Sequence, residues 1–188
     1  MRHPAQDDWE AAIDLAARLE SDLAEFSAPA ETSRAAFENS PDTKPMEPDD
    51  VLVAAFDSRI LDSDLRKAAR SRFISKHYAD AVESGVKALN ECIRLRTGRT
   101  EDGDALMTES FSVANPLLRI NRLKTKADQS AQRGHMQLCQ GVIGAWRNPR
   151  AHNNLDDAPE KALMMLETVN ELLEVSKAAV RCRRRKNP

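Results

Sequence analysis

The sequence predicts an all-α protein, an antiparallel bundle of four to five helices preceded by an N-terminal helical arm. Residues that favour helices (Ala, Leu, Glu, Lys and Arg) dominate the 188-residue chain. Apolar residues recur at the three- and four-residue spacing of helices, and no stretch alternates as a half-buried strand does. Hydrophobic residues make up 41% of the chain, which is enough for one packed core.

Residues 1–48 are predicted to form an acidic arm, and residues 49–188 a helical domain with a basic tail. Trp9 to Phe26 has the spacing of an amphipathic helix, and four prolines mark the segment after it as a linker. Residues 1–50 carry four basic and thirteen acidic side chains, a net charge of −9, and the remainder carries +7. A basic body is compatible with a polyanionic partner such as RNA. The arm is expected to dock on that body or to recruit a protein partner.

The domain is expected to open with a short helix that Asp49 or Asp50 caps, followed by a helix over residues 61–74. A weak point at Ser75-Lys76 separates this helix from the next, over residues 77–98. Gly98 should end that helix in a left-handed C-cap. The apolar face expected on it consists of Tyr78, Ala81, Val82, Val86, Leu89, Ile93 and Leu95.

A compact connector, residues 103–121, should contain a short helix and a break at Pro116. The third long helix is expected from about Lys126 to Arg147. Pro149 is expected to push Asn148 out of helical geometry, so that the helix ends or kinks there. The apolar set expected on this helix is Met136, Leu138, Cys139, Val142, Ile143 and Trp146.

The last helix is expected over residues 160–180, running into the basic tail. Asp157 and Glu160 have the spacing of a capping box at its start. The Met164-Met165 pair on this helix is expected to be core packing.

Several classes of protein are disfavoured by composition. No run of 18 apolar residues is present, so no membrane span is expected, and a cytoplasmic protein is predicted. The cysteines Cys92, Cys139 and Cys182 lack the CxxC spacing of a metal or disulfide framework. No metal or other cofactor is therefore expected.

The segment RNPRAH places Arg147, Asn148 and His152 around an Asn-Pro dipeptide. An Arg and a His close to a phosphodiester can cleave RNA without a metal. The His takes the proton of the 2′-hydroxyl or gives one to the leaving oxygen, and the Arg stabilises the charge of the transition state. Asn148 can orient the His or bind a phosphate oxygen. The same Arg-x4-His spacing recurs at Arg72 and His77, so the spacing is not specific. On spacing alone, a helix C-terminus that carries cations is favoured over an active site.

Two further groups have structural interpretations. The acid cluster of Glu101, Asp102 and Asp104 precedes a predicted helix and is expected to cap it rather than to hold a metal. His135 is expected to be a surface or packing residue.

Four blocks follow one another within roughly residues 56–180: LRKAARSRFISKHYADAVESGVKALNECIRLRTG, DGDALMTESFSVANPLLRIN, QRGHMQLCQGVIGAWRNPRAHNN and DAPEKALMMLETVNELL. In this order they resemble the Ymh-type family, which is similar to the wider HEPN superfamily. The resemblance implies a bundle that is frequently dimeric and often a metal-independent endoribonuclease of toxin–antitoxin, abortive-infection or CRISPR systems. The family's signature maps onto Arg147, Asn148 and His152, not onto the second copy of the spacing.

The expected function is therefore that of a toxin or effector in antiphage defence, an endoribonuclease that acts by 2′-hydroxyl transesterification. Its expected partners are RNA, a second copy of the chain, and a protein partner or antitoxin at the arm. The alternatives are a non-catalytic adaptor that binds RNA or protein through the same basic face, and a DNA-binding regulator. The residues expected to bind RNA outside the signature are Arg150, Asn153, Arg181, Arg183 and Arg184.

Overall fold

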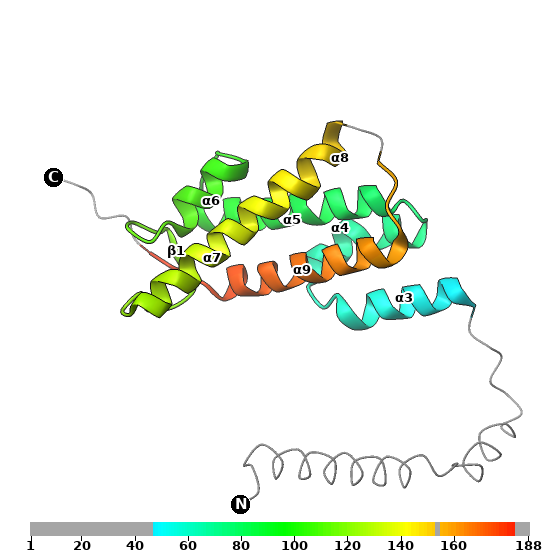
Figure 1. Cartoon of the computed structure of the whole chain (residues 1–188), viewed down its shortest axis with the longest axis horizontal. Coiled ribbons are helices and arrows are strands. Elements are labelled where there is room, and N and C mark those ends of the chain that lie inside the picture. The colour runs from blue at the N-terminus through cyan, green and yellow to red at the C-terminus, as the bar shows by residue number, and fades with distance from the viewer. Residues whose placement is uncertain (1–46, 153–154, 183–188) are drawn as a thin grey trace, which may run out of the picture. The chain divides into compact units, whose positions relative to one another are not determined.

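The structure, a computed structural model, describes residues 47–152 and 155–182 (Figure 1). It confirms the predicted all-α bundle, with a single two-stranded sheet among the described residues. The expected helix over Trp9–Phe26 and the linker after it lie outside the described residues. No helix in the described part of the chain is both long and apolar enough to cross a membrane.

The first two helices begin at residues with clear local reasons. Helix α3 (Pro48–Arg59) starts at a proline, because the first turn needs no backbone N–H from that residue. Asp49 and Asp50 therefore lie inside the first turn and do not cap the helix as expected. Helix α4 (Ser63–Ile74) is capped by Asp62, whose carboxylate accepts hydrogen bonds from the next turn's backbone.

Helix α5 (Tyr78–Thr97) packs against α4 and the later helices. The helical geometry is interrupted before α5 at Lys76, which has a φ of 62°. Gly98 ends it with a φ of 69°, so the predicted left-handed C-cap is confirmed. The predicted apolar face is also confirmed, except that Leu95 is 72% exposed. Leu95 lies two residues beyond Ile93 and therefore on the opposite side of the helix.

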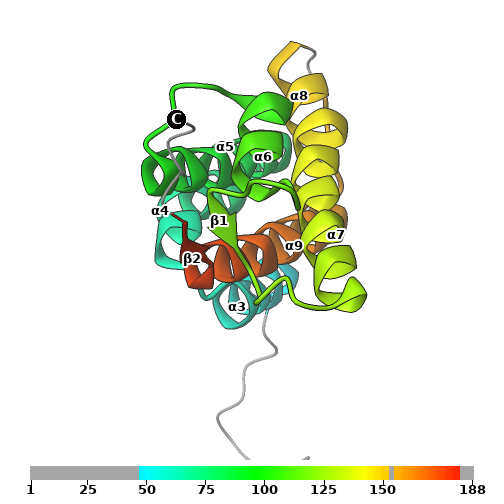
Figure 2. The same cartoon turned by 90° about the vertical axis from the view of Figure 1, so that its left-hand side faces the viewer.

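The connector after α5 contains helix α6 (Gly103–Phe111) and strand β1 (Leu118–Arg119). Strand β1 pairs antiparallel with strand β2 (Val180–Arg181), with Leu118 opposite Arg181 (Figure 2). The sequence predicted no strand, because two residues are too few to show alternation. Gln132 fixes the connector: its amide donates to the carbonyls of Phe111 and Leu118.

Helix α7 (Lys126–Val142) continues through the π-helical segment η1 (Ile143–Arg147) into helix α8 (Asn148–His152). The prediction that Pro149 pushes Asn148 out of helical geometry is wrong, since Asn148 is helical and its N–H donates to the carbonyl of Ile143. A proline lacks an N–H, and its ring clashes with the carbonyl four residues earlier. Hydrogen bonds of the π turn run five residues back, and its wider backbone accommodates Pro149. Leu138, expected in the apolar set, is 57% exposed.

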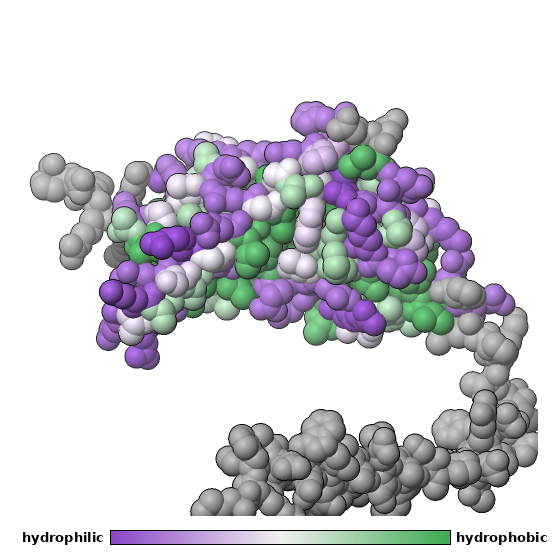
Figure 3. Space-filling model, viewed as in Figure 1, coloured by the Kyte–Doolittle hydropathy of each residue, from purple (hydrophilic) through white to green (hydrophobic). Residues whose placement is uncertain are grey.

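Helix α9 (Pro159–Ala178) begins after Ala158, which makes no side-chain capping bond. The predicted capping box is therefore wrong, because the carboxylate of Asp157 binds other groups, described below. Met165 is buried as expected, whereas Met164 is 53% exposed. The buried apolar side chains form one core between the helices, and polar residues cover much of the face in Figure 3.

Candidate functional site

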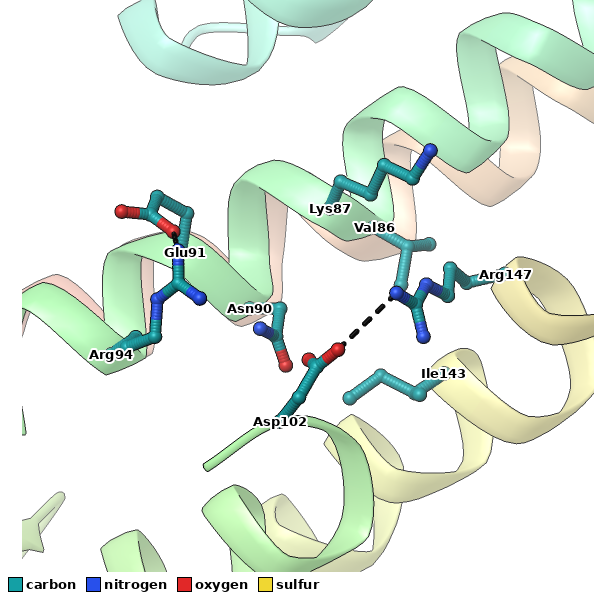
Figure 4. Close-up of a pocket in the computed structure, with 8 residues that line it drawn as sticks. All are labelled: Val86, Lys87, Asn90, Glu91, Arg94, Asp102, Ile143 and Arg147. Atoms are coloured by element: carbon teal, nitrogen blue, oxygen red, sulfur yellow. Dashed lines mark hydrogen bonds and ion pairs between the residues drawn. The ribbon is translucent and has the colours of Figure 1, made fainter. Parts of the chain in front are cut away.

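Arg147, the last residue of η1, lies at the edge of a cavity of about 290 Å³. The cavity is bounded by α5, by η1 and by Asp102 at the start of α6, as Figure 4 shows. Its lining mixes cations, acids, one amide and two apolar residues: Val86, Lys87, Asn90, Glu91, Arg94, Asp102, Ile143 and Arg147.

The guanidinium of Arg147 is held by two neighbours. Its Nη2 lies 3.3 Å from Oδ2 of Asp102, and its Nη1 donates to Oδ1 of Asn148 at 3.3 Å. The side chain is 29% exposed, so it remains accessible to a ligand. Asn148 thus forms a hydrogen bond with the Arg of the signature, and none with His152 among the described residues.

Asp102 combines this ion pair with a capping role. Its Oδ1 accepts a hydrogen bond from the N–H of Gly103 at 2.8 Å, as the predicted cap of α6 requires. The same N–H also donates to Oδ1 of Asn90 at 3.2 Å. The capping role was predicted, whereas the contact with Arg147 was not. No local spacing could have revealed it, because the two residues are far apart in the sequence.

A second cavity, of about 320 Å³, shares Asp102, Ile143 and Arg147 with the first. Gly144, Asn148 and the first residues of α6 complete its lining. The Arg147–Asp102 ion pair therefore borders two cavities, and a ligand in either one meets the guanidinium.

His152, the last residue of α8, is exposed. Within the described residues its side chain makes no hydrogen bond or ion pair with Arg147 or Asn148. A step of five residues along a helix turns by about 140°, so the Arg and His side chains diverge. The expected cluster of three residues therefore includes only Arg147 and Asn148 within one chain.

Arg150, which was expected to bind RNA, is bound inside the protein. Its Nε and Nη2 donate to Oδ2 of Asp157 at 2.8 and 2.5 Å, and its Nη1 donates to the carbonyl of Trp146 at 2.8 Å. The two charged side chains are only 5% and 3% exposed. Lys161 adds a contact to the other oxygen of Asp157 at 3.3 Å. We therefore assign Arg150 the structural role of tying α8 to the start of α9.

The other expected RNA contacts are only partly described. Arg181 lies exposed in β2, and its Nη2 is 3.7 Å from the position that a Cβ on Gly98 would take. Asn153, Arg183 and Arg184 lie outside the described residues.

The second copy of the Arg-x4-His spacing lies at the break between α4 and α5. Arg72 donates to the carbonyl of Ala68 in its own helix at 2.9 Å, and His77 immediately precedes α5. No cavity described above is lined by either residue.

His135 is a packing residue, as expected, in a buried polar cluster. Its Nε2 lies 3.1 Å from Oγ of Ser176, and its ring meets Phe111 edge-on at 4.8 Å. Burial lowers the pKa of His135 to about 4 and raises the pKa of the neighbouring Cys139 thiol to about 12. His135 is therefore neutral near pH 7. Among the described residues, no three His, Cys, Asp or Glu side chains are grouped to hold a metal ion.

A model of one protein family, described as "Protein of unknown function (Hypoth_ymh)", matches residues 59–175. The matched range extends from the end of α3 into α9 and contains Asp102, Arg147, Asn148 and His152. No curated protein and no solved structure matches the chain.

Proposed function

Since the chain belongs to the Hypoth_ymh family, which is described as being of unknown function, we propose a function from the residues of the site: a metal-independent endoribonuclease of HEPN type. It acts in the cytoplasm as a toxin or effector in antiphage defence. The observation that carries the proposal is the guanidinium of Arg147, held accessible beside a cavity, with the exposed imidazole of His152 little more than one turn further along.

The proposed reaction is an internal transesterification. The 2′-hydroxyl oxygen forms a bond to phosphorus, and the bond from phosphorus to the 5′-oxygen breaks. The proton of the 2′-hydroxyl passes to a general base, and a general acid gives a proton to the leaving 5′-oxygen. The products are a 2′,3′-cyclic phosphate and a 5′-hydroxyl, so the reaction needs no oxidant, reductant or further reactant.

Each residue of the signature has a distinct role in this reaction. His152 is the proton-transfer group, and Arg147 stabilises the charge that builds on the phosphoryl oxygens. Asn148 orients Arg147, since its Oδ1 accepts a hydrogen bond from that guanidinium. Arg147 suits this role better than a Lys would, because a guanidinium contacts two oxygens at once.

We further propose that the complete site forms in a homodimer. One chain supplies a single imidazole, and among the described residues no hydrogen bond joins this imidazole to Arg147, whereas the reaction uses both an acid and a base. A two-fold interface presents the same surface twice, so it supplies two imidazoles and two guanidiniums. Trp146 is only partly buried against the core and is available to this interface, whereas Ile143 is 3% exposed and belongs to the core.

Purified protein, RNA and EDTA test the proposal. Cleavage should continue in the chelator, should leave 2′,3′-cyclic phosphate ends, and should be abolished or strongly reduced by His152→Ala. Products that carry 5′-phosphate ends and form only with Mg²⁺ would indicate different chemistry.

The second candidate is a non-catalytic adaptor that binds RNA or a protein partner through the same basic face. One observation favours it: the guanidinium of Arg147 is paired with Asp102, and among the described residues it makes no hydrogen bond with His152. RNA that is bound but left uncut by every preparation would support the adaptor and reject the nuclease.

A further inference from the structure

We propose that the cavity beside Arg147 is the start of a track for the backbone of single-stranded RNA, which follows one face of α5 to Arg181. The inference rests on the proposed function, because it states how an RNA substrate reaches Arg147. It adds a binding surface formed by Lys87, Asn90, Arg94 and Arg181, hereafter the α5 track.

The helical spacing places the members of the α5 track in line. Lys87, Asn90 and Arg94 follow one another at three and four residues, so they share one face of α5, and all three line the cavity with Arg147. Gly98 continues the same spacing, and Arg181 reaches that position from β2, with its Nη2 3.7 Å from where a Cβ would stand. The distance along the helix from position 87 to position 98 is about 16 Å. This length exceeds one nucleotide, so the α5 track fits a strand rather than a single phosphate.

The chemistry of the α5 track is that of hydrogen-bond donors. Lys87 and Arg94 are cations, and Oδ1 of Asn90 accepts from Gly103, which leaves the NH₂ group of Asn90 as its donor. The acidic partners of the two cations are Glu83, at 2.6 Å from Lys87, and Glu91, next to Arg94. The side chains of Lys87 and Arg94 are 55% and 42% exposed in these pairs, so a phosphate can reach each cation from the solvent side. Contacts to phosphates fix the position of a strand without reading its sequence.

Asp102 opposes the binding of a strand at the start of the α5 track. Its carboxylate pairs with Arg147 at 3.3 Å, so it competes with a phosphate for the guanidinium and repels that phosphate. An Asn at this position keeps the hydrogen bond to the N–H of Gly103, because Asn and Asp are equally good N-caps. The substitution Asp102→Asn therefore removes the competing charge without removing the cap.

The α5 track predicts that loss of one of its cations weakens RNA binding, and that loss of the negative charge of Asp102 strengthens it. The probe is a fluorescently labelled single-stranded oligonucleotide with 2′-O-methyl groups throughout, which binds but cannot be cleaved through a 2′-hydroxyl. Lys87→Ala and Arg94→Ala in the full chain should each weaken binding about three- to tenfold, and each should reduce the slope of log K against log salt by about 0.7. Asp102→Asn should tighten binding several-fold. The matched control is Lys67→Ala, since Lys67 is exposed on α4 and lines neither cavity.

Fluorescence anisotropy over a salt series decides the outcome, with circular dichroism to verify that each variant is folded. Affinities of Lys87→Ala and Arg94→Ala that equal that of Lys67→Ala would overturn the α5 track, as would a failure of the wild type to bind the probe. Cleavage of unmodified RNA is measured separately. A protein that binds through the α5 track but cuts nothing would refute the nuclease and keep the track. A protein that cuts RNA but is insensitive to Lys87 and Arg94 would refute the track alone.

Discussion

Acidification should destabilise the bundle through His135 before the carboxylates of Asp57 and Asp62 contribute. The buried imidazole has its pKa lowered from 6.5 to about 4, because burial penalises the charged form. In the unfolded chain the imidazole binds a proton below its ordinary pKa, while the folded protein keeps it neutral. Stability is therefore full above pH 6.5 and decreases as the pH falls toward 4. One pKa unit corresponds to about 1.36 kcal/mol, so the free energy of unfolding should fall by about 3 kcal/mol across this window.

The carboxylates with lowered pKa values affect the free energy of unfolding at lower pH than His135 does. Burial opposes the ionised form of Asp62, but Lys177 and two backbone N–H groups lower its pKa on balance. The hydrogen bond from Arg70 lowers the pKa of Asp57. Each contributes stability that is present above its ordinary pKa of 3.8 and is lost as the pH falls through the lowered value. The interval between pH 6.5 and 4 therefore reports mainly on His135.

Urea unfolding followed by circular dichroism at a series of pH values measures this effect. The variant His135→Gln cannot take up a proton, so its free energy of unfolding should be nearly constant where that of the wild type falls. His77→Gln is the control, because His77 is exposed, and it should keep the wild-type dependence. The reasoning would be refuted if His135→Gln lost stability over this interval as steeply as the wild type.

Three further predictions concern the segment from Arg147 to Asp157. Arg150→Ala should lower the free energy of unfolding by about 3–5 kcal/mol, because it leaves the carboxylate of Asp157 buried without its main partner. Thermal unfolding measures this loss of stability. A smaller loss of stability than in the control variant Lys161→Ala, at an exposed position, would contradict the prediction. His152→Ala should reduce the rate of RNA cleavage by roughly 10²–10⁴-fold, and Arg147→Ala should reduce it by a similar factor. Arg147→Lys should recover little of the lost activity. Single-turnover cleavage rates test this, and near-wild-type rates in these variants would exclude the assigned roles. Mixed dimers of Arg147→Ala and His152→Ala subunits should differ in cleavage rate from either parent, whereas a protein that is fully active as a monomer would rule out a shared site.

The parts of the fold that the sequence predicted are those with local causes. Gly98 ends α5 because a glycine takes the left-handed conformation without strain, and this holds whatever packs nearby. The apolar spacing of α5 likewise identified its buried face. The behaviour of Pro149 was not predictable by such rules, because they treat a proline within an α-helix, and the π turn before it removes the steric conflict.

The candidate site was predictable only in part, since its contacts join distant segments. Arg147 and Asn148 are neighbours in sequence and in space, whereas Asp102 comes from the start of α6. Asp157 looked like a helix cap from its spacing, but the guanidinium of Arg150 is a stronger partner for a buried carboxylate than a backbone N–H. An Asp that caps a helix and an Asp that forms a buried ion pair look identical in a sequence, and only the tertiary packing distinguishes the two roles.

The π turn at η1 amounts to one extra residue stored inside a helix. Each residue of an α-helix turns the chain by about 100°, so an α-helix that kept all of these residues would rotate everything after Arg147 by about that angle relative to α7. Arg150 would then turn away from Asp157, although its place in the motif would look unchanged. Deleting one position of η1 together with the π turn would instead keep that orientation. Relatives whose helix is purely α-helical here should therefore align with a one-residue gap within η1. Matching the RNPRAH segments without that gap would pair side chains that point in different directions.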